Sequence, residues 1–518
     1  MYDGQEELDN LVWDKNDEDS DKALKQMRLK TTCREVERLA EERLRAQATL
    51  VSPLIVGGFN ILYRVHLEKK TATPDVMVRL PCPSLVPFPA EKTIQEAATA
   101  KYISEHTQIP IPRHFCHGRD TTLGPFLILQ HVENRGSMSA RLTRPNNDPS
   151  ATHLLNPRVD EATLETIWSK AASCLLQLSR LTFPRIVALV EVGDEGGSGR
   201  GGSGPYEIAG RPITHNMADM VRLANIPRAV LPPEGTTYGT ADDWYVALAE
   251  MHLAQLVVQQ NDLVESADDC RNKFVARQIF RRLAKQGRLS SFGFAEDDWF
   301  AQSAKLSGRR SLSPGPAGSG AFRLWGDDLR AGNMLLNEAD DLVAMIDWEF
   351  AYAAPTQFVL DPPWWLLLDS AETWSDGIDD WTQRYEARLD IWINAMKRAE
   401  DSVPLGRVDQ PGALPVPLST YMRQSWETGR FWLSYGARKS WAFDMAYWKF
   451  LDERFFGERE GGVLKQDLWK TRMHLLTNQE RAALEPFVER KMRESKDRII
   501  VDWDPVQARR RMSEVLLD

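Results

Sequence analysis

The sequence predicts an α+β protein with two lobes, a small β-rich lobe followed by a large helical one. Two observations support this prediction. Short runs rich in β-branched residues and bounded by turn residues fall mainly within residues 49–134. After about residue 155 the apolar residues mostly follow helical spacing. We therefore expect an N-terminal helical extension over 1–48, a first lobe over 49–134 and a helical lobe over 135–518.

The composition is that of a globular protein with a substantial core. The chain has 518 residues, of which 42% are hydrophobic and 27% charged, and its formal net charge is −10. This acidic balance argues against nucleic acid as a partner. No apolar stretch approaches the ~20 residues that a membrane span needs, so we expect no membrane partner.

The location follows from the N-terminus and the cysteines. The acidic start MYDGQEELDN has the wrong charge for a secretory or mitochondrial leader. The five cysteines are far apart and form no CxxC pair, which indicates reduced thiols rather than a disulfide framework. We expect a cytoplasmic protein, and the sequence contains no indication of its oligomeric state.

The elements of the first lobe follow one another in a clear order. Residues 20–48 have roughly helical apolar spacing, which predicts one amphipathic helix, either packed on the protein or binding a partner. The runs ILYRVHL and VMVRL predict strands near the turn Gly57-Gly58. A helix is predicted over 91–106, ends at the prolines of 109–112, and precedes the strand-like run GPFLILQHV.

The rest of the chain is predicted to be mainly helical. Helices are expected over five segments, namely 161–181, 241–260, 268–286, 379–399 and 480–497. The runs FRLW and LVAMIDW predict two strands on either side of a loop at 326–333. The glycine-rich segments 193–205 and 306–320 are typical of disordered insertions, and we expect neither to carry chemistry.

Three polar residues have the spacing and chemistry of a phosphoryl-transfer site. Asp328 is followed five residues later by Asn333, and Asp347 ends an apolar strand fourteen residues further on. Transfer from ATP needs a carboxylate that orients the attacking hydroxyl and oxygen ligands that hold Mg²⁺ on the phosphates. Asp328 is the candidate catalytic base, and Asn333 and Asp347 are the candidate Mg²⁺ ligands.

In these segments the sequence resembles the aminoglycoside phosphotransferase-like (protein-kinase-like) superfamily, and in particular its fungal group. The resemblance rests on DDLRAGN, MIDWEF, YAAP and PPWW, and on VGGFN and MVRLP nearer the N-terminus. The family's Asp-Leu-x-x-x-Asn loop matches Asp328 and Asn333, and its metal-binding aspartate matches Asp347. The resemblance runs from about residue 50 to the C-terminus. It implies a protein-kinase-like fold with the catalytic loop in 324–350.

The resemblance also implies a nucleotide site in the first lobe. It places Arg79 where kinases usually carry a lysine, and Glu96 is the candidate ion-pair partner. Arginine is always charged and bidentate, so it can hold phosphate oxygens. The segment 129–132 would link the lobes, and the backbone of Gln130 and Val132 would face the adenine.

The turn Gly57-Gly58 is the candidate phosphate loop. A glycine turn lets backbone N–H groups approach phosphates. The same dipeptide also occurs in ordinary hairpins, so both interpretations stay open.

The catalytic loop departs from the family's pattern. Most members have His-Gly-Asp or His-Arg-Asp, whereas this chain has Gly326-Asp327-Asp328. Asp327 is expected either to raise the pKa of its neighbour, since adjacent negative charges disfavour joint ionisation, or to point away and cap the loop.

The function that the resemblance implies is ATP- and Mg²⁺-dependent transfer of the γ-phosphoryl group to a hydroxyl of a small-molecule acceptor. The departures leave a catalytically inactive, nucleotide-binding scaffold as the alternative. A protein kinase is disfavoured because no recognisable activation loop follows Asp347. The tryptophans of the helical lobe, such as Trp364 and Trp365, belong either to the core or to a site for a flat or cationic acceptor.

Overall fold

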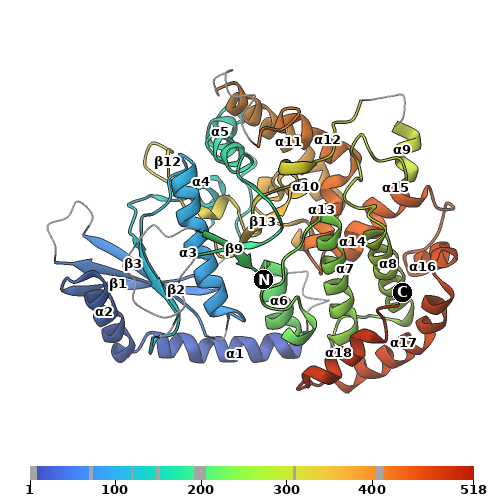
Figure 1. Ribbon diagram of the computed structural model, residues 1–518, viewed down its shortest axis with the longest axis horizontal. Coiled ribbons are helices and arrows are strands. Elements are labelled where there is room, and N and C mark those ends of the chain that lie inside the picture. Colours follow the sequence, from blue (N-terminus) through green and yellow to red (C-terminus); the bar gives the residue numbers. More distant parts are fainter. Residues whose placement is uncertain are drawn as a thin grey trace.

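The computed structural model describes residues 9–68, 74–83, 85–119, 121–146, 152–191, 206–306, 311–402 and 412–517. A small lobe built on a sheet and a larger, mostly helical lobe lie side by side (Figure 1). The predicted α+β class with two unequal lobes is therefore confirmed. Within the described residues, no helix combines the length and apolar character needed to cross a bilayer.

The small lobe contains a five-stranded antiparallel sheet in the order β1-β2-β3-β5-β4. The strands are β1 Ala48–Val56, β2 Asn60–Leu67, β3 Asp75–Pro81, β4 His114–Gly118 and β5 Phe126–Gln130. Side chains alternate between the two faces of a strand. On β3, Val76, Val78 and Leu80 join the core formed with the N-terminal helices. Arg79 therefore points to the opposite face, toward α3 (Pro89–His106).

The N-terminal extension forms two helices, so the expected single helix over 20–48 is wrong. They are α1 (Asn10–Met27) and α2 (Lys30–Leu44). Leu29 interrupts them with extended backbone (φ −62°, ψ 144°) and is exposed. The break lets each helix bury its own apolar side chains in the small-lobe core, Met27 on α1 and Val36 and Leu39 on α2.

The large lobe combines helices with three small sheets, β13-β10-β7, β12-β11-β6 and β8-β9. The strands are β6 Gly136–Ser137, β7 Thr182–Phe183, β8 Ala188–Glu191, β9 Tyr206–Gly210, β10 Phe322–Gly326, β11 Met334–Leu336, β12 Leu342–Met345 and β13 Ala351–Pro355. The helices are α4 Met138–Leu142, α5 Glu161–Leu178, α6 His215–Ala224, α7 Ala241–Val258, α8 Ala267–Lys285, α9 Ala301–Leu306, α10 Thr356–Val359, α11 Gly377–Asp401, α12 Leu418–Thr428, α13 Arg430–Arg438, α14 Phe443–Ala446, α15 Asp452–Phe456, α16 Leu468–Arg472, α17 Asn478–Asp497 and α18 Pro505–Ser513.

Disorder is expected for two glycine-rich segments, 193–205 and 306–320. Residues 193–205 lie outside the described residues. Residues 311–320 are described, so for them the expectation of disorder is wrong. Ser313 is buried, its N–H donates to the side chain of Gln424 at 2.9 Å, and its carbonyl accepts from the N–H of Ala295 at 3.0 Å. These bonds fasten the segment to α12 and to the loop between α8 and α9.

The tryptophan core of the large lobe gives the first prediction. Trp392 is fully buried on α11, with the rings of Trp365 and Trp168 at 5.6 and 6.2 Å between centroids. Trp392→Ala should lower the free energy of unfolding by about 3–5 kcal/mol, because it removes a buried ring and leaves a cavity. The urea midpoint of far-UV circular dichroism measures the loss. Trp299→Ala, where 38% of the residue is exposed, is the control, and an equal shift in both variants would contradict the prediction.

Candidate active site

A cleft of about 1250 Å³ is lined by residues of both lobes. Seven of the nine sequence-predicted site residues line it, namely Gly57, Gly58, Arg79, Gln130, Val132, Asp328 and Asp347. The other two residues lie directly behind this wall. Glu96 pairs with Arg79, and Asn333 bonds to Asp347. Residues that are far apart in the sequence thus come together at one place.

Strand pairing explains how Asn333 and Asp347 meet. The strands β11 and β12 are antiparallel, with Met334 opposite Met345. The residues that flank this hairpin are therefore neighbours, and the N–H of Ile346 donates to the carbonyl of Asn333 at 2.9 Å. The side-chain amide of Asn333 donates to Asp347 Oδ2 at 3.2 Å.

Asp347 combines an unusual backbone with a strong ion pair. Its φ is +71°, in the left-handed region that a non-glycine residue rarely adopts. Burial alone would raise the pKa of Asp347, but the guanidinium of Arg79, in close ion-pair contact, outweighs it and holds that pKa below its ordinary value. Asp347 is therefore a carboxylate that stays ionised on the wall of the cleft.

Arg79 is the centre of a buried charge network that joins the lobes. Its side chain is only 7% exposed and lies 3.0 Å from Glu96 on α3 and 3.0 Å from Glu349, besides its contact with Asp347. The expected Arg79–Glu96 ion pair is thus present. Burial alone would lower the pKa of Arg79. The carboxylates of Glu96 and Asp347 outweigh burial and raise that pKa above its ordinary value, so the guanidinium remains charged.

Sequence reasoning missed three members of this network. Lys92 makes a close ion pair with Glu349 and donates to Asn60 Oδ1 at 3.0 Å, and Asn60 Nδ2 donates to Glu349 at 3.0 Å. Burial, assisted by the charge of Arg79, lowers the pKa of Lys92 to about 7. One signal was available, because Lys92 and Glu96 are four residues apart and share a helix face.

The catalytic loop holds Asp328 at the cleft. The side-chain oxygen of Asn333 accepts from the N–H of Arg330 at 2.9 Å, which fixes the loop. The guanidinium of Arg330 lies 3.6 Å from Asp328. Burial raises the pKa of Asp328, against the opposing charges of His215 and Arg330. A carboxylate with a raised pKa is a better proton acceptor, as a general base requires.

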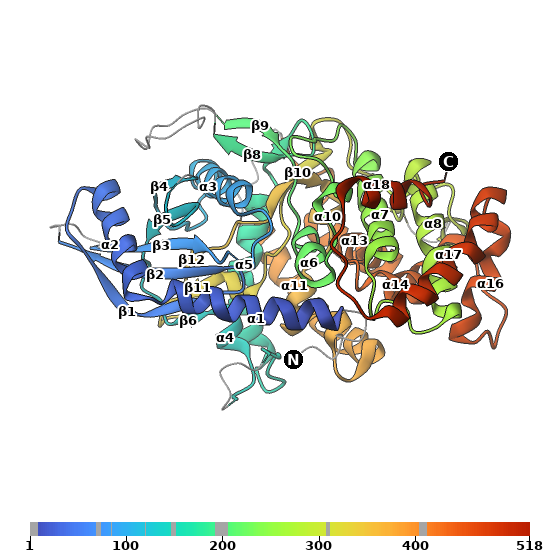
Figure 2. The same cartoon turned by 90° about the horizontal axis from the view of Figure 1, so that it is seen from below.

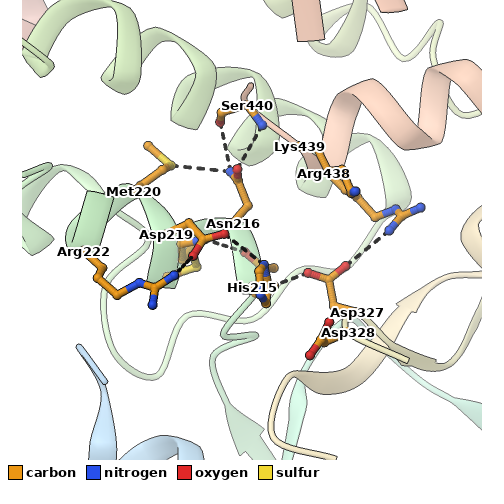
Figure 3. Close-up of polar contacts among 12 residues, drawn as sticks. His215, Asn216, Asp219, Met220, Arg222, Asp327, Asp328, Arg438, Lys439 and Ser440 are labelled. Atoms are coloured by element: carbon orange, nitrogen blue, oxygen red, sulfur yellow. Dashed lines mark hydrogen bonds and ion pairs between the residues drawn. The ribbon is translucent and has the colours of Figure 1, made fainter. Parts of the chain in front are cut away.

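Asp327 points away from Asp328 and ties the loop to α6 and α13 (Figure 3). It accepts hydrogen bonds from the backbone N–H of His215 and from Trp325 Nε1, both at 3.0 Å, and Arg438 lies at 3.4 Å. The capping alternative therefore describes its geometry. Asp327 also contributes to the raised pKa of Asp328, but less than burial does. The loop is braced without the family's histidine.

His215, another residue that sequence reasoning missed, lies beside the loop. Its Nδ1 is 3.1 Å from Asp219, and its ring meets those of Phe59 and Phe350 edge-on at 5.5 and 5.4 Å between centroids. Burial alone would lower the pKa of His215. The carboxylate of Asp219 outweighs burial, with Asp328 and Asp327 assisting, and raises that pKa to about 9.

The first-lobe wall of the cleft contains the remaining predicted residues. The N–H of Gly57 bonds to the carbonyl of Asn60 at 2.8 Å, which closes the turn, and the space around the α-carbon of Gly58 is open. The N–H of Gln130 already bonds to the carbonyl of Arg113 at 2.8 Å. The carbonyl of Val132 accepts from the side chain of Asn134 at 2.8 Å. Of the backbone groups expected to face adenine, these two are already engaged within the protein.

Comparisons with known proteins add structural similarity only. No family model matches the sequence, and a search of curated proteins finds no match. A thermostable mutant of an aminoglycoside phosphotransferase, solved with AMP-PNP and hygromycin B, is 12% identical with a TM-score of 0.36, over 79% of this chain and 98% of that one.

Two further solved structures are similar to the same degree. A macrolide 2′-phosphotransferase type I is 11% identical with a TM-score of 0.36, over 82% of this chain and 96% of that one. Choline kinase from Cryptosporidium parvum Iowa II is 8% identical with a TM-score of 0.35, over 90% and 95%. Similarity of this degree carries no argument about activity, so the proposals below rest on the geometry of the cleft. The relation to fungal members stays a prediction.

The buried network gives the second prediction. Glu349→Gln should lower the free energy of unfolding by about 3–5 kcal/mol, because it removes the carboxylate that pairs with buried Lys92 and one of the three that pair with Arg79. Thermal and urea unfolding measure the loss. Glu133→Gln is the control, since Glu133 pairs with Arg64 but its side chain is 81% exposed, and its loss should be at most about 1 kcal/mol. Equal losses would contradict the network's role.

The raised pKa of His215 gives the third prediction. A histidine pKa of about 9 in the folded protein, against 6.5 ordinarily, means that the His215–Asp219 pair stabilises the fold fully below pH 6.5. That stabilisation is lost as the pH rises through 9. Histidine NMR titration should show one ring with a midpoint near 9, and Asp219→Asn should lower that midpoint while the other eight histidines keep theirs. A midpoint for this ring near 6.5 in the wild type would refute it.

Proposed function

We propose that this protein transfers the γ-phosphoryl group of ATP to a hydroxyl of a small-molecule acceptor, with Mg²⁺ as the required ion. The observation that supports this most is that Asp328, Asp347 and Arg79 line one cleft between the lobes, with Asn333 directly behind Asp347 and bonded to it. This set contains the groups that phosphoryl transfer needs, namely a base, metal-binding oxygens and a buried cation.

Asp328 is the proposed catalytic base. The acceptor oxygen bonds to the γ-phosphorus while the bond from phosphorus to the β–γ bridging oxygen breaks, and the hydroxyl proton passes to Asp328. The burial that raises the pKa of Asp328 favours this proton transfer. Asp327 and Arg330 keep the loop in place, and His215 offsets the negative charge of the adjacent carboxylates.

Asn333 and Asp347 are the residues that would hold Mg²⁺. They offer an amide oxygen and an ionised carboxylate, which suit this ion. Within the described residues, no three His, Cys, Asp or Glu side chains come close enough to form a metal site by themselves, so nucleotide phosphates and water would complete the coordination. Bound Mg²⁺ supplies neutralisation of phosphate charge.

The nucleotide is proposed to lie against the first-lobe wall. Arg79 would neutralise phosphate charge, with Glu96 bracing it. The turn Gly57-Gly58 would cover the phosphates, and the backbone at Gln130 and Val132 would border the adenine. A cytoplasmic location and the absence of nucleic-acid and membrane partners belong to the same proposal.

A second candidate is a non-catalytic nucleotide-binding scaffold. It is favoured by one observation, that Arg79 is already paired with three carboxylates, Glu96, Asp347 and Glu349. A network closed in this way is also compatible with a structural role. The two candidates differ in whether bound ATP is turned over.

The fourth prediction tests the binding and the chemistry separately. ATP with Mg²⁺ should raise the melting temperature of the wild type, since ligand at ~100-fold over its dissociation constant adds about 2.7 kcal/mol. Asp347→Asn should remove the Mg²⁺-dependent part of the shift. Asp328→Asn should keep the shift and reduce turnover of a hydroxylated acceptor by at least about a thousandfold, as expected for a lost base.

The control is Asp341→Asn, an exposed aspartate that pairs with Lys170 away from the cleft. It should change neither the shift nor turnover. A wild type that shows no shift with Mg²⁺·ATP would refute both candidates. A shift without turnover across a panel of hydroxylated metabolites would favour the scaffold.

A further inference from the structure

The helix α1 crosses from one lobe to the other, which is visible from below the molecule (Figure 2). It has 18 residues and is therefore about 27 Å long. Its two ends are attached to different lobes, and the attachments differ in kind. A helix fastened in this way fixes the separation of the lobes as long as both ends hold.

The C-terminal end of α1 belongs to the small lobe. Met27 is buried in the core between the sheet and α2, where Leu24 packs against the same side chains. The carbonyl of Met27 accepts a hydrogen bond at 2.7 Å from the hydroxyl of Tyr63, which is fully buried on β2. Opening this end would expose part of an apolar core.

The N-terminal end is held on the large lobe by polar contacts around Asp9 and by packing of α1 against α6, and Val12 in this first turn is buried. Asp9 caps the helix through the N–H of Val12 at 3.1 Å and accepts from Asn261 Nδ2 at 3.1 and 3.0 Å. The N–H of Asn10 donates to Asp262 at 3.0 Å, and Asn261 Nδ2 also bonds to the carbonyl of Ile499 at 2.9 Å. We refer to Asp9, Asn10, Asn261 and Asp262 as the latch.

The first turn of α1 borders the cleft. Trp13 lines it, as do Asp219 and Arg222 on α6, the helix that carries His215 at its start. α1 and α6 pack against each other. A ligand that enters beside α6 therefore passes the first turns of α1.

The latch is the end of α1 that can open at the lower cost. Asp9 is only 1% exposed, and burial raises its pKa against the lowering effect of its hydrogen bonds. Release at this end would solvate the carboxylate and expose Val12, whereas release at Met27 would open the larger apolar core between the sheet and α2. On release, water replaces the hydrogen-bond partners of the Asp9 carboxylate, which offsets part of the interaction that is lost.

We propose that α1 is a strap that holds the lobes at their present separation, and that release of its latch opens the cleft to ligands. The proposal rests on the cleft being the ligand site, not on the reaction that takes place there. It assigns to the N-terminal extension a task within its own chain.

The test compares three full-length variants. Asn261→Ala removes the side-chain contacts of Asn261 with Asp9 and Ile499 while the helix cap stays intact. Asp9→Ala removes the cap together with every contact between Asp9 and Asn261. Asp14→Ala is the control, because Asp14 is an exposed aspartate on the same helix. Hydrogen exchange measures the amides of residues 13–20 and 24–27, and stopped flow measures dissociation of methylanthraniloyl-ATP with Mg²⁺.

In both latch variants, exchange over 13–20 should become at least tenfold faster while 24–27 stays within twofold of the wild type. Dissociation of the nucleotide probe should become at least threefold faster. Asp14→Ala should match the wild type in every measurement. Unchanged exchange in Asn261→Ala, or faster exchange with unchanged probe dissociation, would overturn the proposal.

One outcome separates this inference from the proposed function. If the wild type binds no probe, the proposed nucleotide site fails. The strap is then tested by hydrogen exchange of the amides of residues 57–60, which lie at the cleft. Faster exchange there in Asn261→Ala supports the strap, and unchanged exchange overturns it.

Discussion

The structure of the cleft depends on the burial of opposite charges at the boundary between the lobes. Arg79 and Lys92 come from the small lobe, and Asp347 and Glu349 come from the large one. A buried charge is tolerable only when it is paired, because desolvation penalises the ionised form. The lobes must therefore meet in the orientation that pairs these charges. This requirement positions the glycine turn, α3 and the loop 326–333 relative to one another.

The loop around Asp328 is held in place largely by the side chain of Asp327. Asp327 makes three polar contacts, with the start of α6, with Trp325 and with Arg438. Two of these contacts come from elements distant in sequence, α6 and α13, so tertiary structure helps to fix the loop in addition to its own residues. His215 reaches the site for the same reason, since the bond from its N–H to Asp327 brings the start of α6 to the loop.

The sequence was informative where local pattern decides structure and less so where packing decides it. The strands of the first lobe and the long helices of the second follow apolar periodicity, and the spacing of Asp328, Asn333 and Asp347 indicated one site. Glu349 and Lys92 were missed, since a charged residue in a mixed segment is usually exposed and only the meeting of two lobes buries these. The segment 311–320 was misjudged because its order comes from contacts with α12.

The left-handed backbone of Asp347 has a consequence for how this protein can change. A non-glycine residue at φ +71° carries strain of order 1–3 kcal/mol, which the hairpin and Arg79 must offset. Glycine there would relieve the strain and also remove a carboxylate from a crowded site. That substitution would also take a partner from the buried guanidinium of Arg79, so the strain of this backbone and the pairing of that charge act on stability in opposite directions.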